Sequence, residues 1–556
     1  MDDVDAVNAQ IARTMLESGD WVTARINGVL YLEKSPLGYW LTASCYALFG
    51  VHDWAARLPA ALGAIALMWV TAALGRWAYG PRAGFYSGLA IGTSVGLFLF
   101  TRIAIPDVLL TLAITVALYC FLRTIVAEEQ FWVYGFWASL GAGMLLKGLL
   151  AVLVPLATAT LFLLIRRQFF NRRTWALLRP VSGIGLMLAI YLPWVVLAAW
   201  RNPPIFDFTF RSEPGVYHGF LWFYFINEHV LRFLNLRYPR DYNTVPRLAF
   251  LLLHFAWIFP WSVFLPAALF SSGNDGRAKS LRLLVIVWIV FLLTFLSFST
   301  TQEYYSMPCY PAFAILVGAT LAMAPNRWVL TGYGVLAVFG VLAGAVAGVI
   351  LYLIKGVVAV GDISSALTQH PETYTLSLGH LQDLTLASFA YLRGPLVLAA
   401  IAFVGGTLAA WFLRRQWMAP LCLAMMMLLF FQAARWAMAA FDPYLSSRPL
   451  ADAIATGPKG QLILEGHYYP ASSVGFYTGL PALLLNGRAD NLVYGSVAPV
   501  VPPVFIEDSD LAQLWKTPRR LYLVAPAESR PRLEQLLGNL TVFAASGGKF
   551  VFTNVP

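Results

Sequence analysis

The sequence predicts a polytopic α-helical membrane protein with a small α/β domain at its carboxyl end. Hydrophobic residues make up 59% of the 556-residue chain and charged residues only 12%, and the mean hydropathy is +0.67. This composition excludes an ordinary soluble domain. Many apolar runs reach the roughly 20 residues that a helix needs to cross a bilayer core. After residue 438 the pattern changes to short strand-like runs separated by glycine, proline and polar residues.

The first 53 residues are predicted to form amphipathic surface helices around a loop. In AVNAQIARTMLESG, Val7, Ile11 and Met15 share one helix face, and Gly19 suits the end of the helix. A charged segment of this length would have to cross the membrane with no span before it. We therefore expect a further helix before Met1, which would bring the number of spans to about thirteen.

Apolar segments between residues 54 and 440 are predicted to form a transmembrane domain of about twelve spans. Residues 131–165 also allow one long helix that is broken at Lys147-Gly148. The predicted spans cover residues 54–78, 82–101, 105–124, 131–146, 149–165, 178–200, 246–271, 281–299, 307–323, 328–353, 394–413 and 417–438.

Basic residues predict the orientation in the membrane. Arginine and lysine gather in alternate loops, above all at residues 166–179, and such loops are expected on the cytoplasmic side of the inner membrane. Residues 1–53, the large loops at 201–245 and 355–393, and a soluble domain at 441–556 then lie on the periplasmic face. Because topology accounts for the formal charge of +10, we expect membrane lipids and no nucleic acid as partners.

The carboxyl-terminal domain is predicted from three strand-like runs and one helix. GQLILEGHYY, PALLLNG and RRLYLVAP read as short strands, and ESRPRLEQLLG reads as a helix between strands. The predicted fold of this domain is therefore α/β.

Several polar motifs fall in the segments assigned to the outer face. They supply carboxylates for a general base, cations for a phosphate and aromatic rings for the face of a sugar. Each also has an ordinary role, such as a carboxylate at a helix N-terminus or a lysine that reaches the membrane surface. The candidate residues are Asp3 and Asp5 of MDDVD, Glu33, Lys34 and Tyr39 of VLYLEKSPLGYW, Asp107 of TRIAIPDVLLTL, Lys147 of GMLLKGLLAVLVP, Glu228, His229 and Arg232 of FYFINEHVLRF, and Glu303, Tyr304 and Tyr305 of STTQEYYSMPCYP.

The acid and histidine side chains are compatible with a divalent metal as a cofactor. Glu33 and His229 are the candidate ligands, although two ligands without a third make a weak metal site. Arg232 follows His229 by three residues and would share its face on an α-helix, where it could contact a phosphate through two N–H groups.

The order of the motifs resembles the bacterial membrane glycosyltransferases of the protein O-mannosyltransferase superfamily, and most closely their lipid A aminoarabinose transferase branch. The resemblance covers roughly residues 2–330 and implies a GT-C fold, a sugar donor linked to polyprenyl phosphate, and a site on the periplasmic face. It rests on ARTMLESGDWVTARINGVLYLEKSPLGYWL, AARLPAALGA, TRIAIPDVLLTLAI, LLKGLLAVLVP, FLWFYFINEHVLRFL, IFPWSVFLP and QEYYSMPCYPAFAIL in that order.

The resemblance also implies roles for the motif residues. Lys34 matches the first-loop lysine that holds the donor phosphate, Lys147 matches the lysine of the family's KG motif, and Arg232 matches the arginine of its EHxxRF motif. We expect all three to bind the departing phosphate. Glu33 matches the acid just before the first-loop lysine, and Asp107 matches the acid of the second loop. Glu228 and His229 match the EHxxRF motif, and Tyr305 matches the tyrosine of the later loop.

The catalytic acid of the first loop stays open between two residues. Counting back from Lys34 without a gap places the family's Asp-Glu pair on Val4-Asp5, whereas Asp3 requires a gap of one residue. Asp107 is expected to be the partner of this acid, and Glu33 is expected to turn away from Lys34 toward His229 or the later loop. The later loop also departs from the family, because its usual KLPxY pattern is QEYYS here, and this puts the acceptor in doubt.

We therefore expect a glycosyltransferase that moves a hexose or pentose from undecaprenyl phosphate to a lipid or glycolipid, above all lipid A. Protein O-mannosyl transfer is the alternative within the same class. A lipid or sugar transporter is the alternative from another class, but the motif charges lie at span ends and no inverted repeat is evident.

Overall fold

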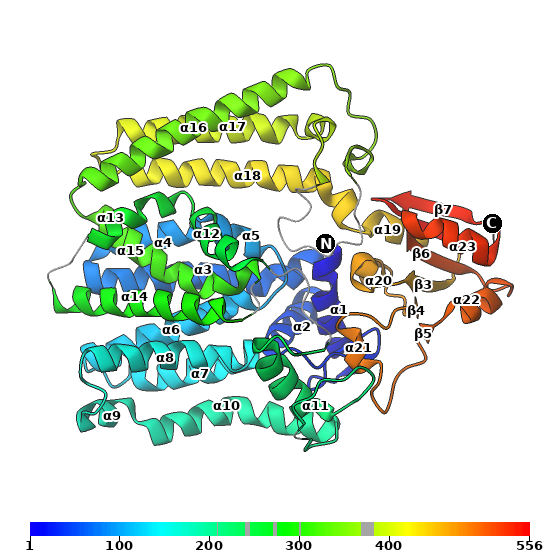
Figure 1. Cartoon of the computed structure of the whole chain (residues 1–556), viewed down its shortest axis with the longest axis horizontal. Helices are drawn as coiled ribbons and strands as arrows, with labels where there is room; N and C mark the ends of the chain where they lie inside the picture. The colour runs from blue at the N-terminus through cyan, green and yellow to red at the C-terminus, as the bar shows by residue number, and fades with distance from the viewer. Residues whose placement is uncertain (208, 239–244, 271–274, 300–301, 369–382, 556) are drawn as a thin grey trace.

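The computed structural model describes residues 1–207, 209–238, 245–270, 275–299, 302–368 and 383–555. Long helices form a bundle that makes up most of the molecule, and a mixed sheet flanked by short helices lies at one end of it (Figure 1). Helix α1 (Asp3–Ser18) lies between the bundle and the sheet, although it begins the described chain.

The bundle contains the predicted apolar segments as helices. Proline, glycine or a polar residue ends most of them, as expected for helix termini. The helices are α3 (Asp53–Tyr79), α4 (Pro81–Gly92), α5 (Val95–Thr101), α6 (Asp107–Val126), α7 (Trp132–Lys147), α8 (Leu150–Ile165), α9 (Arg172–Leu178), α10 (Pro180–Arg201), α12 (Arg247–Trp257), α13 (Leu265–Phe270), α14 (Gly276–Ser297), α15 (Tyr310–Ala322), α16 (Arg327–Leu353), α17 (Arg393–Phe412) and α18 (Ala419–Leu445).

Within the described residues, eight helices are long and apolar enough to cross a membrane, or up to ten if each of two bent pairs forms one span. The bent pairs are α4 with α5, at 51°, and α12 with Trp261–Leu269, at 96°. The predicted count of about twelve is not confirmed. Helices α7 and α8 have 16 residues each, which is about 24 Å of helix and less than the hydrocarbon core of a bilayer.

Residues 131–165 do not form one long broken helix, so that alternative is wrong. Helix α8 turns back and lies beside α7 (Figure 1), and a Cβ placed on Gly143 would lie 2.7 Å from the Cβ of Ala151. The reversal occurs at Gly148, whose φ of 67° and ψ of −143° favour glycine.

The amino-terminal segment folds as a helix, a hairpin and a second helix. Gly19 ends α1 in the left-handed conformation with φ 71°. Strands β1 (Arg25–Ile26) and β2 (Val29–Leu30) are antiparallel, and Asn27-Gly28 turns between them with positive φ at both residues. Helix α2 (Leu37–Phe49) follows. The apolar face of α1 is buried against the sheet domain and the bundle rather than lying on a free surface, since Val7, Ile11 and Met15 are at most 1% exposed.

The short helices η1 and η3 carry the later motifs of the outer loops. The π-helix η1 (Trp222–Leu231) follows the single turn α11 (Gly219–Leu221). The 3-10 helices are η2 (Trp261–Phe264) and η3 (Glu303–Cys309), and η3 leads directly into α15. Two further 3-10 turns, η4 (Ile363–Ala366) and η6 (Ala387–Ala390), lie in the predicted outer loop at 355–393, part of which is outside the described residues.

The predicted α/β domain is confirmed as a six-stranded mixed sheet of order β5-β4-β3-β6-β8-β7. Strands β3, β4, β5 and β6 are parallel, and β8 is antiparallel to both β6 and β7. Its elements are α19 (Arg448–Thr456), β3 (Gln461–Glu465), η7 (Tyr469–Ala471), α20 (Ser472–Thr478), β4 (Ala482–Leu485), α21 (Leu492–Gly495), β5 (Phe505–Ile506), α22 (Asp508–Trp515), β6 (Leu521–Pro526), η8 (Ala527–Ser529), α23 (Arg530–Leu537), β7 (Thr541–Ser546) and β8 (Lys549–Thr553).

Alternate side chains of the strands point to opposite faces of the sheet, and one of these faces packs against α1. Leu462 and Leu464 of β3 face the same buried cluster as the apolar residues of α1, whereas Ile463 faces the cluster beneath α22 and α23. One face of the sheet therefore packs toward the rest of the molecule.

Candidate functional site

Two adjoining cavities lie where the amino-terminal segment meets the bundle. The larger has a volume of about 410 Å³ and the smaller about 70 Å³. Lys34, Ser35 and Lys147 line both. The other residues lining the smaller cavity are Asn8, Ala9, Gly38, Tyr39, Thr42, Ala56, Pro59, Ala60, Ala104, Ile105, Pro106, Asp107, Leu109 and Tyr304. The others lining the larger are Glu33, Leu149, Leu150, Leu153, Tyr224, Glu228, His229, Val230, Arg232, Phe233, Leu234, Phe295, Leu296, Ser299 and Tyr305.

The larger cavity combines a cationic end with apolar walls. Lys34, Lys147 and Arg232 supply the cations, and α8, α14 and the end of η1 supply leucine and phenylalanine side chains. These cations come from three widely separated parts of the sequence, and each was predicted to contact a phosphate. A cavity of this kind suits a ligand with an anionic head and a long apolar tail.

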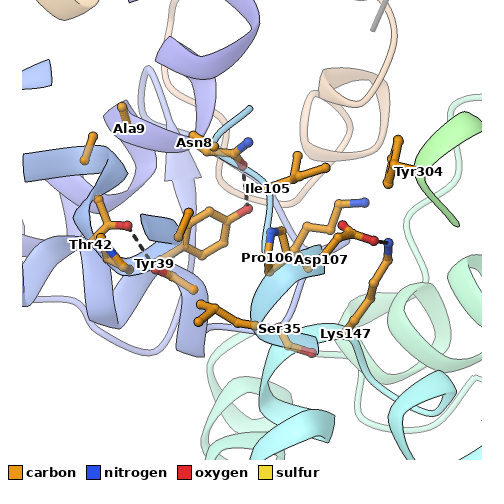
Figure 2. A pocket seen from close by; sticks show the side chains of 17 residues that line it. Asn8, Ala9, Ser35, Tyr39, Thr42, Ile105, Pro106, Asp107, Lys147 and Tyr304 are labelled. Atoms are coloured by element: carbon orange, nitrogen blue, oxygen red, sulfur yellow. Dashed lines mark hydrogen bonds and ion pairs between the residues drawn. The ribbon is translucent and has the colours of Figure 1, made fainter. Parts of the chain in front are cut away.

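Lys147 lies at the last residue of α7 and is held by three groups. Its Nζ donates a hydrogen bond of 2.5 Å to Oδ1 of Asp107, which is the first residue of α6. The same Nζ lies 5.0 Å from the ring centre of Tyr304 and 4.9 Å from that of Tyr305. Figure 2 shows Lys147 and Asp107 pointing toward one another beside Tyr304. Asp107 therefore orients a partly buried cation, and the aromatic rings add cation–π contacts.

Glu33 contacts Lys34 directly, so the prediction that it turns away from Lys34 is wrong. Its Oε1 lies 3.3 Å from Nζ of Lys34 and accepts a 2.7 Å hydrogen bond from the hydroxyl of Tyr31. Burial raises the pKa of Glu33, but nearby cations, Lys34 and Arg237 first, outweigh burial and bring the pKa below its usual value. The side chain is therefore an ionised partner of the cationic end of the cavity.

Glu228 of η1 binds two arginines that follow this helix. Its Oε2 accepts a 3.1 Å hydrogen bond from Arg232, and its Oε1 accepts one of 2.6 Å from Arg237. Arg232 also donates to the hydroxyl of Tyr305 at 3.0 Å. Arg232 directly follows the last residue of η1, and both His229 and Arg232 line the larger cavity. Arg232 is thereby held with its guanidinium at the cavity.

Both ring nitrogens of His229 are engaged by the backbone. Nδ1 donates to the carbonyl of Tyr224 at 2.5 Å, and Nε2 accepts the N–H of Leu149 at 3.2 Å. Burial lowers the pKa of His229, which favours this neutral form. His229 and Glu33 both line the larger cavity, but in the described part of the chain no group of three or more His, Cys, Asp or Glu residues could hold a metal ion. Both ring nitrogens of His229 and Oε1 of Glu33 already have protein partners, so this pair does not form a preorganised metal site.

Gly148→Ala is expected to destabilise the site by about 1–3 kcal/mol, because the mirror-β backbone at this position is open only to glycine. A Cβ at Gly148 would lie 2.3 Å from Nε2 of His229 and 2.7 Å from the hydroxyl of Tyr224. We expect a lower thermal denaturation midpoint in detergent and slower turnover. Gly185→Ala in α10 is the matched control, since nothing lies within 4 Å of its Cβ position. Equal midpoints for the two variants would contradict this account of Gly148.

The two candidate acids of the first loop point in different directions. Asp5 forms an ion pair with Arg57 and accepts the N–H of Ala104 at 2.8 Å. Asp3 instead forms an ion pair with Lys549 of the sheet domain at 2.7 Å. Neither acid lines the two cavities described above, but Asp5 faces the loop that leads to Asp107. Asp3 therefore lies on the side of α1 that faces the sheet domain.

Three of the four remaining predicted residues line one of the two cavities. Tyr39 and Tyr304 line the smaller cavity and Tyr305 the larger, whereas Glu303 lines neither. The hydroxyl of Tyr39 donates to Oδ1 of Asn8 at 3.4 Å (Figure 2).

Sequence reasoning missed Asn8, Ser35 and Arg237 of this site. Asn8 follows Asp5 by three residues on α1, so helical spacing could have indicated it. Ser35 donates to the carbonyl of Met144 at 2.8 Å and is hydrogen-bonded to the hydroxyl of Tyr224. No local pattern marks Arg237, because its burial depends on Glu228.

Comparison with known proteins supports the predicted resemblance. Residues 33–196 match the family described as dolichyl-phosphate-mannose-protein mannosyltransferase. The chain is 28% identical over 411 residues to undecaprenyl phosphate-alpha-4-amino-4-deoxy-L-arabinose arabinosyl transferase 1 of Pseudomonas fluorescens (strain Pf0-1), with 71% of this chain and 66% of that protein aligned. It is 26% identical over 328 residues to the corresponding transferase of Yersinia enterocolitica, with 57% of this chain and 55% of that protein aligned. The chain thus aligns with less than two thirds of the length of either relative.

Solved structures show the same fold. The chain superposes on the crystal structure of ArnT from Cupriavidus metallidurans bound to undecaprenyl phosphate with a TM-score of 0.81 and 24% identity, covering 99% of this chain and 93% of that one. The apo structure of the same protein gives a TM-score of 0.77, also at 24% identity, with 100% of this chain and 93% of that one covered. The predicted GT-C fold is confirmed.

Proposed function

We propose that this chain, a multi-pass membrane protein with the GT-C fold, is a glycosyltransferase that moves a sugar from undecaprenyl phosphate to a lipid or glycolipid acceptor such as lipid A. The observation that carries this proposal is the larger cavity, where Lys34, Lys147 and Arg232 meet apolar walls. A phosphate attached to a lipid needs cations to bind its charge and an apolar surface to contact its tail. The relatives named above, which carry undecaprenyl phosphate in their names, support the same donor.

The cations fit the charge that develops in such a transfer. An acceptor oxygen attacks the anomeric carbon, the bond from that carbon to the donor phosphate oxygen breaks, and its electron pair stays on the departing phosphate. Preorganised lysine and arginine groups stabilise this growing negative charge in a cavity of low dielectric constant. The smaller cavity adjoins the same cations and carries the polar side chains of Asn8, Tyr39 and Thr42, so it suits the sugar.

The acids then have separate roles in the proposed reaction. Asp107 holds Lys147 at 2.5 Å and so positions a phosphate-binding group. Asp5 is the first-loop acid that we assign to the site, because it faces the loop before Asp107. An acceptor hydroxyl needs a base to take its proton, whereas an acceptor phosphate is already ionised at neutral pH.

We also propose that the site and the sheet domain lie on the periplasmic side of the inner membrane. Helix α9 and the arginines around it lie at the end of the bundle opposite the sheet (Figure 1). A basic end of this kind is expected in the cytoplasm.

The proposal is tested with purified protein in lipid and a set of undecaprenyl phosphates that carry labelled sugars. We expect label from at least one donor in the glycolipid fraction. Label in protein would instead indicate protein O-mannosyl transfer, the activity named in the description of the matching family. If label stays on every donor while the protein moves intact lipid or sugar across vesicles, the chain is a transporter and the proposal fails.

A further inference from the structure

Helix α1 contacts the sheet domain with one side and the helix bundle with the opposite side. Asp3 and Asp5 are two residues apart, which turns them about 200° around the helix axis. Asp3 faces the sheet domain and Asp5 faces the bundle. The position of one acid therefore fixes the position of the other.

Asp3 is bound by a complete set of donors from the sheet domain. Its Oδ2 accepts hydrogen bonds from Nζ of Lys549 at 2.7 Å and from the hydroxyl of Ser447 at 2.9 Å. Its Oδ1 accepts the N–H of Ser473 at 2.9 Å. The side chains of Lys549 and Asp3 are 7% and 5% exposed. A buried pair with its hydrogen bonds satisfied defines one geometry, and loss of either partner leaves an unpaired buried charge.

Two further residues of α1 continue the contact along helix α20. Gln10 donates to the carbonyl of Ser472 at 2.6 Å, and Arg13 donates to the carbonyl of Phe476 at 3.1 Å. Together with Asp3 they fix both the rotation and the axial position of α1 against the sheet domain.

The contact lies at the edge of the sheet where open α/β folds bind ligands. The strand order turns at β3 and β6, because β4 and β5 extend to one side and β8 and β7 to the other. Lys549 pairs with Pro526, the last residue of β6. Ligands of such sheets bind beyond the carboxyl ends of the strands at this turning point. Here the amino-terminal end of α1 reaches this edge, and the Asp3 carboxylate takes the place of an anionic ligand.

The opposite side of α1 forms part of the cavity region. Asn8 and Ala9 line the smaller cavity, and Asp5 holds Arg57 and the N–H of Ala104. A shift of α1 would therefore move a wall of the smaller cavity, while Lys34, Lys147 and Arg232 are carried by other elements.

We infer that Lys549 is a positioning residue for sugar transfer, which acts through Asp3 to hold α1 and thereby Asp5 and Asn8 in place. This inference rests on the proposed function. It gives the sheet domain a defined task in the reaction at a distance from the cavity.

The test compares full-length Lys549→Met with Lys516→Met, a lysine exposed at the end of α22. Three quantities are measured: hydrogen exchange of peptides from residues 3–18, the transfer rate at saturating donor, and the dissociation constant of undecaprenyl phosphate. For Lys549→Met we expect faster exchange in α1 and a transfer rate lower by roughly 10²-fold, since a small displacement of reacting groups is costly. We expect the dissociation constant to change by less than about twofold, because Lys34, Lys147 and Arg232 are untouched. Lys516→Met should match the parent in all three.

A second variant separates positioning from stability. Asp3→Asn combined with Lys549→Met leaves no unpaired buried charge, so thermal stability should return toward the parent value. The transfer rate should stay low, because the charged contact that orients α1 is absent. Recovery of transfer together with stability would overturn the inference, as would unchanged exchange in α1 or an equal loss of donor binding in Lys549→Met. Failure of the proposed function gives a different result, because the parent protein would then transfer no sugar from any donor, and exchange in α1 would still show whether Lys549 anchors the helix.

Discussion

Lys147→Met is expected to lower the rate of sugar transfer by about 10²–10³-fold, the cost typical of removing one group that stabilises developing negative charge. Lys147 lines both cavities, so it can contact the phosphate where the sugar is attached. Methionine keeps most of the length and apolar surface of the side chain but removes the cation. The removal also leaves the Asp107 carboxylate, 3% exposed, without its ion-pair partner. The measurement is the initial rate of transfer by purified protein in lipid at saturating donor.

The matched control is Lys355→Met, which removes another lysine that contacts an aromatic ring. Lys355 is exposed and lies 4.3 Å from the ring centre of Tyr352. It lines neither of the two cavities described above. We expect the control to keep the parent rate, and Asp107→Asn to fall between the two lysine variants because it loosens Lys147 without removing the charge. A Lys147→Met protein that kept more than half of the parent rate would contradict the role given to this lysine.

The sequence could predict the cationic end of the cavity because charges in an apolar chain are costly. An ionisable residue within or beside a span is retained only when it has a partner or a task. Lys34, Lys147 and Arg232 interrupt apolar or aromatic stretches, and the structure brings all of them to one cavity. Their roles in binding stay predictions until the variants are measured.

The contacts between distant segments could not be predicted in the same way. Asp3 and Lys549 are 546 residues apart, and the lysine begins an ordinary-looking strand. The sequence predicts that Glu33 turns away from Lys34, but the fold of the loop brings Oε1 of Glu33 within 3.3 Å of Nζ of Lys34. Local propensity carries no information on which surface a helix will contact, so the different partners of the two acids on α1 could not be predicted from the sequence.

Helix geometry explains why the described residues contain eight to ten candidate spans where the sequence predicts about twelve. Hydropathy detects apolar stretches but not a bend inside one, such as the 96° angle between α12 and Trp261–Leu269. It also does not fix where a short helix ends, and Gly148 ends α7 after 16 residues. The apolar segments were therefore placed correctly as helices, while the number that cross the bilayer did not follow from composition.

Asp5→Asn is expected to lower the transfer rate by about 10²-fold, comparable to other losses of alignment or proton transfer at a reacting centre. The Asp5 side chain is 2% exposed, and asparagine would leave the Arg57 guanidinium without its carboxylate partner. Asparagine can still accept the N–H of Ala104 through its carbonyl oxygen, so the loop that leads to Asp107 should stay folded. The matched control is Asp452→Asn on α19, whose side chain is 64% exposed and lies 3.6 Å from Arg448. Such an exposed pair contributes little, so the control should keep the parent rate and stability.

The comparison of Asp5→Asn with Asp3→Asn decides which acid serves the site. Asp3→Asn weakens the contact with Lys549 and should therefore speed hydrogen exchange in α1. Asp5→Asn leaves that contact intact, so its exchange in α1 should equal that of the parent while its transfer rate falls. A full transfer rate in Asp5→Asn, with a loss confined to Asp3→Asn, would show that the sheet-facing acid alone matters and that the assignment of Asp5 is wrong. The two acids can be separated by experiment because one helix turn directs them to different partners.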